Sequence, residues 1–72
     1  MSLSNIEKGK KAVITRINVG SSLFFRLAAM GLVPGVEVVM INNSLHNGYI
    51  IGCKDARLVL GRGLAHTIEV QG

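Results

Sequence analysis

The chain has 72 residues, of which 49% are hydrophobic and 17% charged, with a net charge of +4. Disordered chains combine low hydrophobicity with high charge, so this composition predicts one small folded domain over residues 1–72, with a core too thin for a deep catalytic cleft. A single cysteine, Cys53, excludes an internal disulfide and fits a reducing cytoplasm, and no apolar stretch reaches the ~18 residues of a membrane helix. We expect a cytoplasmic protein that neither inserts into a membrane nor is exported.

The first half of the chain predicts one strand followed by one short helix. Residues 10–19 alternate through β-branched side chains with the period of two that is typical of a strand. Ser21 and Ser22 follow Gly20, and a serine at this place can accept a hydrogen bond from the free amides of a helix start. The helix is therefore expected to begin near Ser22 and to end at Gly31, because glycine readily adopts the positive φ that ends helices.

A turn of about 100° per residue gives this helix two different faces. The face expected to pack into the core comprises Leu23, Phe24, Leu27, Met30 and Gly31. The opposite face carries Phe25, Arg26 and Ala29.

The second half of the chain predicts four more strands. Runs rich in β-branched and apolar residues place them at 36–41, 49–52, 57–60 and 66–71, the last with Ile68 and Val70 pointing inward. The expected connections are a turn at Pro34-Gly35, a polar loop over 42–48 with a hairpin turn at Asn47-Gly48, a tight turn at 54–55, and an irregular or single-turn link over 61–65. We therefore predict a mainly β fold, a small SH3-like, partly open barrel of about five strands with one short helix inserted after strand one.

Metal and phosphate chemistry find little support in the sequence. His46, Cys53 and His66 are the only soft ligands, and their spacing matches no metal motif, so neither an intrinsic metal site nor a cofactor is expected. The segment Gly61-Arg62-Gly63 lacks the Lys-Ser/Thr and the long helix of a phosphate-binding loop, so it is interpreted as a turn.

Catalysis is also not expected. The four carboxylates lie on separate predicted elements and have no neighbouring base or nucleophile. They are Glu7, Glu37, Asp55 and Glu69. Ser21 and Ser22 are better explained by helix capping than by a catalytic triad. The sequence predicts a protein that is not an enzyme.

The basic residues leave nucleic-acid binding as an alternative function. They are scattered over several predicted elements, and they include Lys8, Lys10, Lys11, Lys54, Arg57 and Arg62. The few aromatic residues make a base-stacking platform hard to assemble, so a nucleic-acid partner is not expected.

Phe25 is the most informative single residue, because an aromatic side chain on the polar face of a helix is either covered by a loop or serves as an anchor for another protein. The predicted partner-binding residues are Phe25 and its neighbours Arg26, Met30, Leu32 and Val33. The alternative is that Arg26 is merely solvated and that Leu32 completes the core.

The helix and its exit carry the order Arg26-Leu27, Met30-Gly31-Leu32 and Pro34-Gly35. This order resembles the signature of the FeoA family, small cytoplasmic accessory proteins of bacterial ferrous iron uptake. Further segments match in the family's order and spacing, at 3–9, 48–52, 58–60 and 65–70. The turn at Cys53-Lys54-Asp55 departs from relatives, which often carry glycine there.

The resemblance implies a five-stranded SH3-like barrel with an inserted helix that binds and modulates FeoB, a membrane iron permease with a cytosolic G-protein domain. It implies a non-catalytic partner, and it leaves self-association open. Two alternatives remain, a basic SH3-like nucleic-acid-binding module and an iron-responsive regulatory domain, since the same fold occurs in iron-dependent repressors. The chain lacks the helix-turn-helix of those repressors, which favours the transport role.

Overall fold

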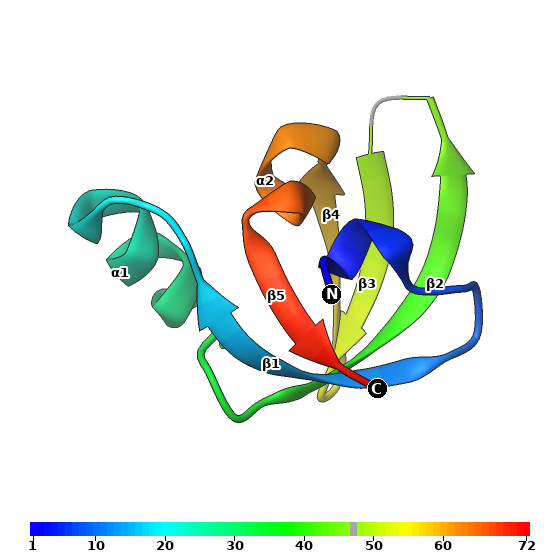
Figure 1. The fold of residues 1–72 in the computed structure, drawn as a ribbon, viewed down its shortest axis with the longest axis horizontal. Coiled ribbons are helices and arrows are strands. Elements are labelled where there is room, and N and C mark those ends of the chain that lie inside the picture. Colours follow the sequence, from blue (N-terminus) through cyan, green and yellow to red (C-terminus); the bar gives the residue numbers. More distant parts are fainter. Residues whose placement is uncertain (47) are drawn as a thin grey trace.

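The structure is a computed structural model and describes residues 1–46 and 48–72. Its elements in chain order are η1 (Leu3–Asn5), β1 (Lys11–Ile17), α1 (Ser21–Ala29), β2 (Glu37–Leu45), β3 (Gly48–Cys53), β4 (Ala56–Gly61), α2 (Arg62–His66) and β5 (Ile68–Gln71). In these residues the strands form one antiparallel sheet of order β4-β3-β2-β1-β5. Figure 1 shows the sheet curling into a partly open barrel, with α1 projecting from one side. The expected mainly β fold with a helix after the first strand is confirmed.

Strand β1 lies inside the sheet and not at an edge, because it pairs with both β2 and β5. Ala12 and Ile14 point into the barrel, as the alternation predicted. The register with β5 then shifts between Ile14 and Arg16, and Ile17 is buried three residues after Ile14. Such a bulge inserts one residue and increases the local bend. It lets β1 turn with the barrel wall while keeping Ile17 in the core.

Strand β2 is longer than predicted. It continues to Leu45, although the Asn and Ser residues after Ile41 predicted a loop. Pairing with β3 overrides this local preference, since Asn42 still lies opposite Ile50 after a register shift. The predicted hairpin residue Asn47 lies outside the described residues. The predicted tight turn between β3 and β4 is confirmed at residues 54–55, where Lys54 has a φ of 56°.

Helix α1 begins one residue earlier than predicted and without a serine cap. Gly20 is the N-cap, with extended backbone, and its carbonyl accepts the Phe24 N–H at 2.9 Å. Ser21 and Ser22 already have helical backbone, so the predicted serine cap is wrong. The predicted end is confirmed, because Gly31 has a φ of 90° and its N–H donates to the Ala28 carbonyl at 2.9 Å. Among the described residues, no helix has the length and apolar character needed to cross a membrane.

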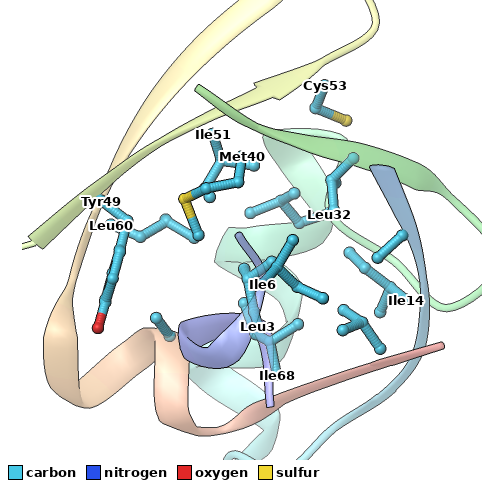
Figure 2. Close-up of a cluster of buried hydrophobic side chains, with 14 of the residues drawn as sticks. Leu3, Ile6, Ile14, Leu32, Met40, Tyr49, Ile51, Cys53, Leu60 and Ile68 are labelled. Carbon is cyan, nitrogen blue, oxygen red and sulfur yellow. The ribbon is translucent and has the colours of Figure 1, made fainter. Parts of the chain in front are cut away.

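The core lies inside the barrel and includes an unpredicted contribution from the N-terminus. Figure 2 shows Leu3 and Ile6 among side chains from the strands, and Leu3 is fully buried. The Ser2 hydroxyl accepts the Ser4 N–H at 3.1 Å, which stabilises the short 3-10 turn η1. The opposite end of the chain behaves as predicted, because Ile68 and Val70 of β5 are buried.

Candidate protein-binding site

The outer side of α1 exposes apolar side chains that the barrel does not cover. Phe25 is 69% exposed and Met30, at the end of the helix, is 44% exposed. Arg26 and Ala29 lie between them and are also exposed. We call Phe25, Arg26, Ala29 and Met30 the helix patch. Figure 1 shows α1 at the side of the barrel, and the exposure of these side chains makes this side of the helix accessible.

The inner side of α1 holds the helix patch in place. Leu27 is buried, and Leu23 and Phe24 are half-buried against the core. The Phe24 and Phe25 rings meet edge to face, with centroids 5.9 Å apart and planes at 85°. Aromatic pairs favour this arrangement, which restricts the motion of both rings. Phe25 is thus supported from beneath by a ring that itself packs against the core.

The exit from α1 fixes the far end of the patch. The Leu32 N–H donates to the Leu27 carbonyl at 3.0 Å, and the Cys53 thiol donates to the Gly31 carbonyl at 3.8 Å. A turn follows, in which the Val36 N–H donates to the Val33 carbonyl at 3.2 Å and Gly35 has a φ of 96°. These contacts attach the C-terminal end of the helix to β3 and to the start of β2.

Two of the predicted partner-binding residues, Leu32 and Val33, are less exposed than expected. Leu32 has no exposed surface and belongs to the core, because the chain turns inward directly after Gly31. Val33 is half-buried. Leu32 therefore completes the core, which was the alternative considered for it.

Met30 is likewise placed differently from its expected position on the core face. Its backbone, with a φ of −88° and a ψ of 0°, has already left the helical path, so the count of about 100° per residue no longer applies to it. Its exposed side chain joins Phe25 and Arg26 on the surface. The alternative in which a neighbouring loop covers Phe25 does not hold, given the exposure of its ring.

The residues considered for metal binding make other contacts. Cys53 is buried at the end of β3, the His66 imidazole Nδ1 lies 3.0 Å from the Ser4 hydroxyl, and the exposed His46 accepts the Arg62 Nε–H through its carbonyl at 2.8 Å. Within residues 1–46 and 48–72, no group of three or more His, Cys, Asp or Glu side chains is placed to hold a metal ion.

Sequence reasoning missed one exposed residue on the sheet. Val59 of β4 is 71% exposed, whereas the next residue, Leu60, is buried. The signal was present, because alternation along β4 puts Arg57 and Val59 on the outer face and Leu58 and Leu60 on the inner one.

Comparison with known proteins gives one family. The model of the FeoA domain matches residues 1–72. A protein of Methanocaldococcus jannaschii, named as a candidate Fe(2+) transport protein A, is 33% identical over 70 residues, which cover 96% of this chain and 83% of that protein. The crystal structure of an iron uptake regulatory protein (FeoA) superimposes with a TM-score of 0.89 at 28% identity, covering 99% of this chain and 95% of that one.

A third comparison concerns the fold alone. The zinc complex of FeoA from Stenotrophomonas maltophilia, described as a prokaryotic SH3 domain protein, has a TM-score of 0.82 at 22% identity and covers 99% of this chain and 89% of that one. The expected SH3-like barrel is confirmed. With the family model matched along its whole length, this chain belongs to the FeoA family, whose role is accessory to ferrous iron transport.

Proposed function

We propose that this chain is a non-catalytic cytoplasmic accessory protein that binds the cytosolic region of a FeoB-type ferrous iron permease through the helix patch. Membership of the FeoA family supports the connection to iron transport.

The observation that carries the proposal is the 69% exposure of Phe25 on a helix at the side of the barrel. Residues that dominate protein interfaces are enriched in aromatic and arginine side chains set among smaller contacts. The helix patch supplies Phe25 and Arg26 side by side, with Met30 as an adaptable apolar neighbour. The ring is already held by Phe24, so binding costs little side-chain entropy.

The mechanism is differential binding. A protein with no reactive groups can change transport only if it binds one conformation of the permease more tightly than another. The helix patch is held in one geometry, because Leu27 packs into the core beneath it and the Gly31 carbonyl next to Met30 accepts the Cys53 thiol. Tight binding to both conformations alike would leave the permease unaffected.

A binding titration with the purified cytosolic region of the permease tests the proposal. We expect Phe25→Ala to weaken binding by about tenfold or more, since an aromatic anchor contributes more than about 1.4 kcal/mol. Val13→Ala is the matched control, because Val13 is a 37% exposed apolar residue on β1, away from α1. Equal affinities for the three proteins, or no binding at all, would refute the proposal.

The salt dependence of binding separates this function from nucleic-acid binding. Phosphate contacts release counterions, so affinity for nucleic acid falls steeply as salt is raised. The helix patch has one charged residue among apolar ones, so we expect permease binding to depend only weakly on salt.

A further inference from the structure

The two edges of the sheet differ in the pairing of their backbone groups. At the β5 edge, the N-terminal residues act as a short extra strand: the Val70 N–H donates to the Met1 carbonyl at 2.7 Å, and Ser2 bridges to Glu69. At the β4 edge, β3 is the one strand partner within the described part of the chain. An unpaired edge presents a row of backbone donors and acceptors to solvent.

The register shows which β4 residues offer these groups. A two-residue turn at Lys54-Asp55 joins Cys53 and Ala56, and the closing pair of such a hairpin is hydrogen-bonded. Hydrogen-bonded pairs alternate, so Ala56, Leu58 and Leu60 direct their backbone groups toward β3. Arg57 and Val59 therefore direct their N–H and C=O groups away from β3, toward the open edge.

The side chains beside this edge have two distinct characters. Val59 is 71% exposed and lies opposite the half-buried Ile50, which makes an apolar end. Arg57 lies opposite Gly52, in a cross-strand row that runs through Val39 to Lys11.

A hollow beside Gly52 is lined in part by Lys11, Glu37 and Lys54. The Val39 and Ile41 side chains cover Gly52 itself, because an added Cβ would meet them at 2.7 and 3.1 Å. Arg57 does not line this hollow, but it follows the turn that carries Lys54, so two basic residues lie at this end of the β4 edge. The carboxylates nearby are Glu37 in this hollow and Asp55 in the turn, so the basic groups outnumber the acidic ones.

We propose that the open edge of β4 accepts an extended acidic peptide segment as an additional strand. Its backbone would bond to Arg57 and Val59, with an acidic side chain beside Arg57 and an apolar side chain two residues away beside Val59 and Ile50. The spacing of two follows from the alternation of side chains along a strand. This inference concerns a different surface from the helix patch and does not depend on the proposed function.

Charge favours this occupant over a second copy of the chain. Two β4 strands paired antiparallel about Val59 would place Arg57 opposite Gly61, so a second copy supplies no carboxylate to Arg57, and both copies carry a net charge of +4. Like charges across an interface oppose association, whereas an acidic segment neutralises them.

The test uses the full chain, labelled with nitrogen-15, and the capped peptide Thr-Thr-Val-Thr-Glu-Thr-Thr. We expect its amide shift changes to centre on β4 residues 56–61, with a dissociation constant at or below about 1 mM. The peptide with lysine in place of glutamate should bind about tenfold more weakly or not at all. Arg57→Glu should weaken the glutamate peptide by about five- to tenfold, and Arg16→Glu, a charge reversal at an exposed site on β1, should have little effect.

Two peptides with methylated backbone nitrogens test the strand pairing itself. One is methylated at the valine and glutamate, the other at the alternating threonines, and in a paired strand the N–H groups of only one of these sets face β4. One of the two should therefore lose binding and the other keep it. Equal binding of both, shift changes away from β4, or no shift changes would overturn the proposal. Shift changes at β4 that depend on protein concentration without peptide, together with a dimer in light scattering, would assign the edge to a second copy instead.

Discussion

The barrel and α1 differ in how far they bury their apolar side chains. Inside the barrel, residues from η1 and from every strand are buried together, and Leu3, Met40, Ile51 and Ile68 have no exposed surface. On α1, only Leu27 is buried, and one of the two phenylalanines, Phe25, lies mainly in solvent. We expect the fold to need the first set and to form without Phe25. Apolar surface that folding does not use is available for recognition.

The boundary between these two regions lies at the exit of α1. Met30 is 44% exposed, Gly31 follows with a positive φ, and Leu32 is fully buried. Three consecutive residues thus pass from surface to core. Substitutions on the core side of this boundary are expected to lower stability, whereas substitutions on the exposed side are expected to change it little.

The largest effect is expected for Leu32→Ala compared with Met30→Ala. Leu32 is fully buried, so its truncation removes packing and leaves a cavity, which costs about 2–5 kcal/mol. Met30 is at the surface, so its truncation should change the free energy of unfolding by less than about 0.5 kcal/mol. Urea unfolding measures both. Similar losses in the free energy of unfolding for the two variants would contradict a boundary between surface and core at Gly31.

A smaller effect is expected for Gly31→Val. A β-branched side chain is strained at a φ of 90°, which costs about 1–3 kcal/mol, whereas space is sufficient because an added Cβ would lie 3.9 Å from the Cys53 sulfur. The matched pair is Gly31→Ala and Gly63→Ala. Gly63 lies in α2 without a positive φ and with open space around it, so alanine there should stabilise by up to about 1 kcal/mol. The same sign for both alanine variants in thermal unfolding would contradict this account of Gly31.

A small effect on stability is also expected for Phe25→Ala. The exposed ring contributes little to the core, so the free energy of unfolding should change by less than about 1 kcal/mol. Its edge-to-face contact with Phe24 is the main interaction lost. Differential scanning calorimetry checks the value, and a severe loss of folding would place Phe25 in the core.

The sequence predicted the features that depend on local pattern. The alternation of Ile68 and Val70 follows from the period of a strand, and the helix end follows from the backbone freedom of Gly31. The face of Phe25 was also predictable from helical spacing. Whether a loop covered that ring depended on tertiary contacts, which one sequence does not reveal.

The features that the sequence did not predict depend on boundaries and on distant partners. A shift of one residue at the start of α1 moved Ser21 out of the cap position, and the end of the helix at Ala29 changed the direction of Met30. Leu3 was missed because a 3-10 turn of three residues is too short to show a period. The extension of β2 beyond Ile41 arises from pairing with β3, which overrides the loop preference of its Asn and Ser residues.

The most direct test of the central claim is to map the surface that meets the permease. Amide shifts of the labelled chain would be recorded while the unlabelled cytosolic region of the permease is added to saturation. We predict that the largest changes fall on residues 21–33, around Phe25 and Met30, and that Phe25→Ala needs about ten times as much of the permease region, or more, to reach them. Unchanged amides in this segment at saturation would contradict the account.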